Sequence, residues 1–166
     1  FLYNIKNHQV AFIAKDSLEK IPIFGKWILR IRGLYIHRGD ARASLKTINE
    51  GVDYLKQGFS LVIFPEGTRS RSSKLGEFKP GSFKLATKAR VPVVPVTLNG
   101  GYRTYEERGA VTKGCHIDFM VHEPILTKDM SRQELAELPH RVEEIIRNGL
   151  DVLTAQESRE AETKAD

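Results

Sequence analysis

The sequence contains a single cysteine, Cys115, among its 166 residues. One thiol cannot form a disulfide within the chain, and metal clusters built from several cysteines are excluded. The five histidines show no HExxH or comparable ligand spacing, so we expect no metal site. No run approaches the roughly 20 apolar residues that a transmembrane helix needs. These absences exclude disulfide-rich and metal-centred classes of protein, and they exclude a helix that crosses a membrane within this sequence.

The charge balance is basic. Lys and Arg number 26 against 21 Asp and Glu, which gives a formal net charge of +5 and a pI of about 9.4. A basic excess favours anionic partners such as nucleic acid, anionic lipid or phosphorylated metabolites, and it does not choose among them.

The apolar pattern alternates between strand-like and helix-like segments. Strands are predicted at 9–14, 34–38, 60–64, 91–98 and 116–121, and helices at 22–33, 40–58, 81–89 and 131–153. Such alternation predicts an α/β fold with a mixed, largely parallel sheet flanked by helices. We expect one domain over residues 1–153, with Pro139 as an interruption in its last helix, and a polar, disordered tail over residues 154–166.

The segment FPEGTRSRS, residues 64–72, follows the third predicted strand. Ligands of open α/β sheets bind where strands end. Gly67 allows a ligand to approach the backbone closely, Thr68 offers a hydroxyl, and the Arg69 guanidinium can hold a phosphate in a bidentate manner. Glu66 could orient an arginine or a substrate hydroxyl. The segment predicts a cradle for a phosphate or a polar head group, and the alternative is a solvated turn without a ligand.

Several segments together resemble one enzyme family. VIFPEGTRSRS resembles the third motif block of the 1-acylglycerol-3-phosphate (lysophosphatidic acid) acyltransferases. In the order of that family, AKDSLEKIPIFGKWI resembles the stretch before its second block, GLYIHR the second block, and FKPGSFKLATKARVPVVPV the Phe-Lys-x-Gly helix with the fourth block. The matches cover most of residues 10 to 98. The resemblance implies the glycerolipid acyltransferase fold, which the domain over residues 1–153 would adopt.

The family's general base is a His in a His-x-x-x-x-Asp block, in which the Asp orients the imidazole. His8 is the first histidine of this sequence, but Asp16 follows it by eight positions and residue 13 is Ile. Lys15 and Asp16 also match the family downstream of the catalytic block. His8 is therefore not expected to be the base. We expect the catalytic dyad upstream of Phe1, so no catalytic residue is assigned within this chain, and the chain alone is expected to be inactive.

Two further cations end predicted strands. Lys15 ends the first strand and Arg38 the second, which would bring them to the same edge of the sheet as the cradle. By resemblance, Arg38 matches the arginine of the second block, and Gly67 and Arg69 match the block that holds glycerol phosphate. The alternatives are a surface lysine at position 15, and an ion pair of Arg38 with Asp40 or Glu66.

The helix predicted at 22–33 has two interpretations. Ile21, Phe24, Trp27, Ile28 and Ile31 recur at helical spacing, with four basic residues around them. Such a helix can pack in a core, or it can lie at the interface of an anionic membrane.

The resemblance implies transfer of a fatty acyl group from an acyl-carrier-protein or coenzyme A thioester to the hydroxyl of a lysophospholipid. It implies no cofactor beyond that donor, action at the cytoplasmic face of the cytoplasmic membrane, and no nucleic-acid partner. Two alternatives stay open: an acceptor with another head group, such as a different lysophospholipid or an ornithine lipid, and a basic nucleic-acid-binding domain. The second would carry aromatic and basic residues on an exposed sheet face.

Overall fold

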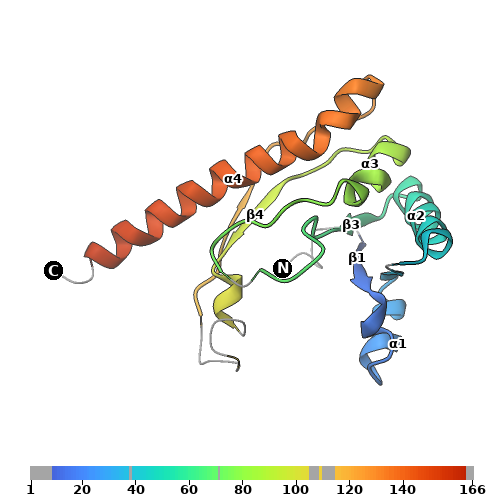
Figure 1. Cartoon of the computed structure of the whole chain (residues 1–166), viewed down its shortest axis with the longest axis horizontal. Helices are drawn as coiled ribbons and strands as arrows, with labels where there is room; N and C mark the ends of the chain where they lie inside the picture. The colour runs from blue at the N-terminus through green and yellow to red at the C-terminus, as the bar shows by residue number, and fades with distance from the viewer. Residues whose placement is uncertain (1–8, 38, 71, 105–108, 110–114, 164–166) are drawn as a thin grey trace. The chain divides into compact units, whose positions relative to one another are not determined.

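The computed structural model describes residues 9–37, 39–70, 72–104, 109 and 115–163 (Figure 1). Contacts group them into two compact units. The first unit consists of Phe1–Pro65 with Gly81–Val91, and the second of Glu66–Pro80 with Pro92–Asp166.

The first unit contains a parallel sheet of three strands. Its strands lie in the order β2-β1-β3, and they are β1 (Val10–Lys15), β2 (Leu34–Ile36) and β3 (Ser60–Val62). In register, Val10 lies opposite Ser60, and Lys15 opposite Ile36. Val10 and Ala11 are adjacent in β1 and both are buried. Successive side chains of a strand point to opposite faces, so the central strand is covered on both.

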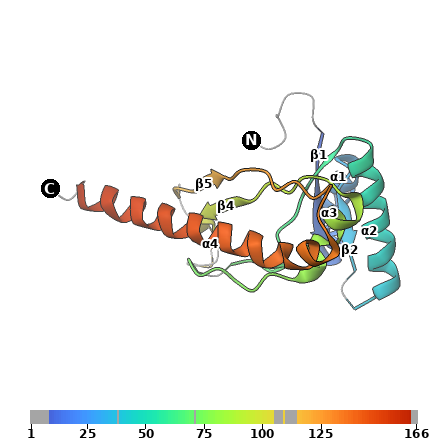
Figure 2. The same ribbon diagram turned by 90° about the horizontal axis from the view of Figure 1, so that it is seen from above.

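Helices lie between the strands of this unit and after its last strand. They are η2 (Asp16–Leu18), α1 (Phe24–Arg30), α2 (Ala41–Lys56) and α3 (Lys84–Ala89), the last preceded by η3 (Pro80–Phe83). Asp40 caps α2, where its carboxylate accepts a hydrogen bond of 2.9 Å from the Ala43 amide. Helices α2 and α3 lie side by side (Figure 2). Gly51 allows this close packing, because a Cβ there would lie 2.6 Å from the Leu85 side chain of α3.

Helix α1 is shorter and more exposed than a core helix would be. It begins at Phe24 rather than near Pro22, and it buries Gly25 and Ile28. Phe24 and Trp27 are exposed although their spacing allows both to face a core. Of the two interpretations of this segment, the structure therefore favours the surface helix.

The second unit contains an antiparallel pair of strands and one long helix. These are β4 (Val96–Asn99) and β5 (Asp118–Val121), with η4 (Gly101–Thr104) between them, and α4 (Arg132–Thr163). β4 starts later than the predicted strand 91–98 because Pro92 and Pro95 have no amide proton to donate to a ladder. Before β4, only an isolated bridge pairs Val93 with Ile125 among the residues that the structure describes.

Two expectations about the C-terminal region were wrong. Helix α4 continues across Pro139 without interruption, and it continues to Thr163, through most of the segment that we expected to be a disordered tail. The segment 154–163 is rich in Ala, Glu, Gln and Arg, which are good helix formers. It also gains a tertiary contact, because Glu157 binds side chains of the strand region of the same unit.

The α/β class with a parallel sheet flanked by helices is confirmed. The antiparallel pairing that we expected within one mixed sheet lies instead in a second sheet. The single domain over residues 1–153 stays a prediction.

Candidate functional site

Glu66 braces the loop that carries the predicted cradle. Its carboxylate accepts hydrogen bonds from the Ser70 hydroxyl, at 3.1 and 3.3 Å, and from the Gly76 amide at 2.8 Å. A Cβ at position 76 would meet the Glu66 carboxylate, so a larger residue there would require the Glu66 side chain to move. The carboxylate therefore connects Ser70 and Gly76, which belong to a loop whose described residues form no helix or strand. Its expected contact with a substrate hydroxyl stays a prediction.

The next three residues continue the loop, with Gly67 half-buried and Thr68 and Arg69 exposed. Gly67 has φ = +66°, a left-handed conformation that glycine adopts without steric cost. The Thr68 hydroxyl donates a hydrogen bond of 3.2 Å to the Arg69 carbonyl. Thr68 and Arg69 are both exposed, so a water-borne phosphate group can reach the hydroxyl and the guanidinium. The structure thus brings four of the predicted binding residues, Glu66 to Arg69, together in one braced loop.

Lys15 belongs to the first unit. It is exposed, it ends β1 and it lies opposite Ile36 of β2. The next residue, Asp16, lies 3.8 Å from the His37 imidazole that follows β2. Arg38 and His8 lie outside the described residues, so the predictions for both remain untested.

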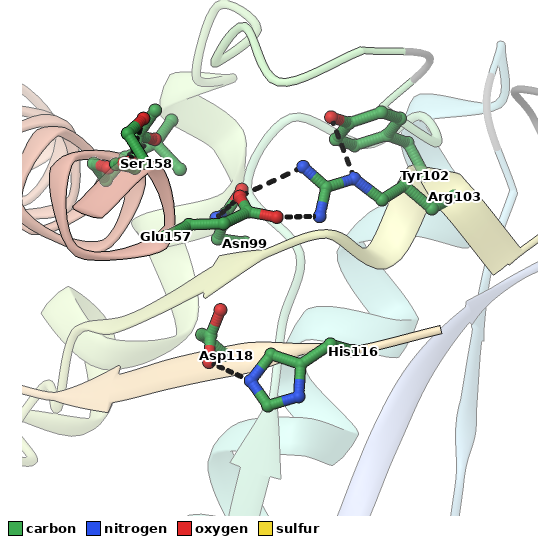
Figure 3. Close-up of polar contacts among 9 residues, drawn as sticks. Asn99, Tyr102, Arg103, His116, Asp118, Glu157 and Ser158 are labelled. Atoms are coloured by element: carbon green, nitrogen blue, oxygen red, sulfur yellow. Dashed lines mark hydrogen bonds and ion pairs between the residues drawn. The ribbon is translucent and has the colours of Figure 1, made fainter. Parts of the chain in front are cut away.

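The second unit contains a polar cluster that the sequence did not predict (Figure 3). Arg103 of η4 holds Glu157 of α4 through both of its terminal nitrogens, and the Asn99 amide donates to the same carboxylate at 3.1 Å. The hydrogen bonds from Arg103 hold the pKa of Glu157 below its ordinary value. The hydrogen bonds that Arg103 donates to Glu157 and Tyr102 raise the pKa of Arg103 above its ordinary value. Arg103 lies 54 positions before Glu157 in the chain, and Asn99 lies 58 positions before it. No local sequence pattern predicts a pairing over such distances.

Two other polar contacts lie near this cluster. The His116 imidazole and the Asp118 carboxylate are 2.6 Å apart. Thr97 is buried in β4, and its hydroxyl lies 2.8 Å from the His122 imidazole. Both contacts join residues of the β4–β5 region, so they fix that region of the second unit.

Within the described ranges, no group of three or more His, Cys, Asp or Glu side chains is placed to hold a metal ion. None of the helices in those ranges combines the length and the apolar character that a membrane span requires.

Residues 1–99 match the family model described as Acyltransferase. The chain is similar to the 1-acyl-sn-glycerol-3-phosphate acyltransferase BAT2 of Brassica napus, with 35% identity over 76% of this chain and 39% of the relative. It is also similar to the 1-acyl-sn-glycerol-3-phosphate acyltransferase of Saccharomyces cerevisiae, with 33% identity over 78% of this chain and 44% of the relative. The chain thus spans less than half the length of either relative.

A solved structure is similar as well. The crystal structure of the 1-acyl-sn-glycerophosphate acyltransferase PlsC from Thermotoga maritima matches with a TM-score of 0.74 and 36% identity. The match covers 89% of this chain and 58% of that one.

Proposed function

Because this chain belongs to the acyltransferase family, we propose that it is part of an enzyme that acylates 1-acylglycerol-3-phosphate to phosphatidic acid. The donor is a fatty acyl thioester of acyl-carrier protein or coenzyme A. In the reaction the acceptor hydroxyl loses its proton to a base and attacks the thioester carbonyl. An ester C–O bond forms, the C–S bond breaks, and the thiol leaves. The thioester already carries the activated acyl group, so the proposed reaction needs no further cofactor.

The loop braced by Glu66 is the observation that carries this proposal. A phosphate recognition loop must hold its backbone and its cation in place before the ligand arrives, because ordering them at binding would lower the affinity. Glu66 braces the loop backbone, Gly67 allows its left-handed turn, and the exposed Arg69 and Thr68 supply a cation and a hydroxyl. In the proposed role, Arg69 binds the phosphate of the acceptor through charge-assisted hydrogen bonds. Lys15 and Arg38, the other two cations that the sequence suggested for acceptor binding, stay predictions.

The proposed place of action is the cytoplasmic face of the cytoplasmic membrane. The acceptor and the product are lipids of a bilayer, whereas the thioester donors are water-soluble. An anionic membrane surface would attract a chain with a formal net charge of +5.

We also propose that the catalytic base is not among these 166 residues. The family base is a His followed by an Asp five positions later, and none of the five histidines here has an Asp at that distance. The 166-residue chain should show no turnover of lysophosphatidic acid, and a chain extended upstream of Phe1 should be active. Activity of the 166-residue chain would contradict this assignment, and His8 would then be the candidate base.

Substitution of Arg69 tests the acceptor in the extended, active protein. We expect Arg69→Ala to raise the KM for lysophosphatidic acid about ten- to a hundredfold, because a hydrogen bond to a charged group contributes roughly 1.5–3 kcal/mol. Arg42→Ala, which removes an exposed arginine of α2, is the matched control and should leave the KM unchanged. Steady-state kinetics with lysophosphatidic acid and with an ornithine lysolipid separate the two acceptor classes. An unchanged KM in Arg69→Ala would remove Arg69 from the site.

A further inference from the structure

Five large apolar side chains around α1 are exposed to solvent. They are Ile21, Ile23, Phe24, Trp27 and Leu29. Ile23 is 84% exposed and Trp27 52%, and the rings of Phe24 and Trp27 stack with their centroids 6.1 Å apart. Scattered apolar residues are common on protein surfaces, but five large exposed ones within nine consecutive residues, two of them stacked on each other, favour an interaction site. We call these five residues, together with Lys20, Lys26, Arg30 and Arg32, the α1 surface.

The first unit holds the α1 surface in a fixed position. Within this helix Ile28 is buried, and the buried Tyr35 hydroxyl donates a hydrogen bond of 2.9 Å to the Gly25 carbonyl. The Gly33 amide binds the Ile28 carbonyl at 2.8 Å and ends the helix. Phe24, Trp27 and Leu29 thus stand on a helix that is anchored to β2, and Ile21 and Ile23 lie in the turn just before it.

Backbone strain accompanies the exposure of Ile23. This residue has φ = +68° and ψ = −54°, and the Phe24 amide binds the Pro22 carbonyl at 2.7 Å across it. These features define a γ-turn of the rare, strained type. A β-branched residue is unfavourable in this conformation, and glycine would adopt it readily. An isoleucine that is both strained and exposed contributes little to folding, and this points to a role outside the fold.

The charges around the apolar group have one sign. Lys20, Lys26, Arg30 and Arg32 are exposed, and residues 20–33 contain no Asp or Glu. The acidic residues just before them are Glu19, which is exposed, and Asp16, which lies 3.8 Å from His37. Long basic side chains can keep their charges at the head groups while their neighbours enter the apolar layer.

We propose that the α1 surface docks on an anionic lipid bilayer and lies in the interface, parallel to the membrane. Apolar anchors flanked by Lys and Arg are the composition that interfacial segments use. A second copy of the chain fits less well, because a twofold contact through this surface would bring the same four cations of each copy together. The proposal rests on the proposed function in one respect, since the acceptor and the product of the reaction are membrane lipids.

Trp27 reports on this docking directly, because it is the single tryptophan of the chain. The 166-residue chain is titrated with phosphatidylcholine vesicles and with vesicles that also contain phosphatidylglycerol. We expect the Trp27 emission to shift to shorter wavelength with the anionic vesicles, and brominated lipid to quench it. An unchanged emission would overturn the proposal. A blue-shifted emission without vesicles that depends on protein concentration would also overturn it, in favour of a second copy.

Substitutions test the apolar and the basic parts separately. Ile23→Gly relieves the strained turn, so the fold should keep its stability while vesicle affinity falls about fivefold or more. Leu98→Ala, at a residue of β4 with 51% exposure, is the apolar control. Lys26→Glu with Arg30→Glu should lower the affinity for anionic vesicles at least about twentyfold, since each basic residue near such a surface contributes roughly a factor of five. Lys46→Glu with Lys56→Glu on α2 changes the net charge equally and should have the smaller effect.

The outcome is independent of the proposed acyl transfer. Vesicle binding needs no turnover, and acylation by the extended protein is measured with detergent-dispersed lysophosphatidic acid. If the α1 variants bind vesicles like the wild type while the detergent assay shows acylation, the docking surface is wrong and the proposed function stands. If docking is as expected and no lysolipid is acylated, the proposed function is wrong.

Discussion

Glu66 shows how a single carboxylate can organise a loop of mixed Gly, Ser and charged residues. The sequence predicts a phosphate cradle at residues 66–69 from residue types, and that binding role stays a prediction. The role of Glu66 was less predictable. An acidic residue beside arginines is easily read as their partner, whereas the described hydrogen bonds of its carboxylate go to Ser70 and to the amide of Gly76.

Glu66→Gln should loosen the loop. Gln keeps one oxygen that can accept from the Gly76 amide, but it loses the charge that strengthens the bond. We expect hydrogen exchange of the Gly76 amide to be about fivefold faster, which corresponds to roughly 1 kcal/mol, the difference between a charged and a neutral hydrogen bond. Amide exchange measured by NMR checks this. Glu77→Gln, which alters an exposed carboxylate next to Gly76, is the control. Equal exchange rates in both variants would show that Glu66 does not brace the loop.

Helix α4 shows what determines the length of an element. The sequence marks its first turn, because Ser131 is followed three positions later by Glu134. In the structure the Ser131 hydroxyl accepts a hydrogen bond from the Glu134 amide at 3.2 Å, and the Glu134 carboxylate accepts one from the Ser131 amide at 2.7 Å. This reciprocal pair is a capping box. The C-terminal half was not readable, because the composition of residues 154–163 suits both a solvated helix and a disordered tail. The contact of Glu157 with Arg103 favours the helix.

The contact between Glu157 and Arg103 should make the C-terminal half of α4 sensitive to acid. The pKa of Glu157 is lowered in the folded state, mainly by hydrogen bonds from Arg103. Its contribution to stability is therefore fully present above the unfolded pKa, about 4.3, and it is lost as the pH falls through the folded pKa. We expect amide exchange in residues 150–160 to accelerate, relative to the intrinsic rate, when the pH is lowered from 6 to 3.

Glu157→Gln should flatten this pH dependence and should already show faster exchange at pH 6. Glu160→Gln is the matched control, because Glu160 is exposed on the same helix. If the wild type and Glu157→Gln give the same pH profile, the ion pair does not stabilise the helix.

At the scale of the whole molecule, the described residues form two compact units, each with its own buried side chains. Val10, Ala11 and Leu34 belong to the first unit. Leu138, Val142 and Leu153 of α4 belong to the second, and Leu138 is 1% exposed. A core within each unit implies that each can lose packing separately.

Leu138→Ala should therefore destabilise mainly the second unit. Truncation of a buried leucine costs about 2–5 kcal/mol, because the removed atoms leave a cavity. We expect amide exchange in β4 and α4 to accelerate far more than in β1. Leu126→Ala is the same substitution at a residue with 69% exposure and should change the free energy of unfolding by about 0.5 kcal/mol or less. Equal acceleration in β1 and β4 would show that the whole chain unfolds as one cooperative unit.

The sequence by itself determined what depends on neighbours along the chain. The alternation of apolar segments predicted the α/β class, and Asp40 and Ser131 mark helix starts. The tertiary structure decided which faces are covered and which distant residues meet. It exposed the apolar side chains of α1, extended α4 to Thr163, and joined Arg103 to Glu157. The physical reason is that periodicity and capping act over a few residues, whereas burial and ion pairing depend on packing between segments that lie far apart in the chain.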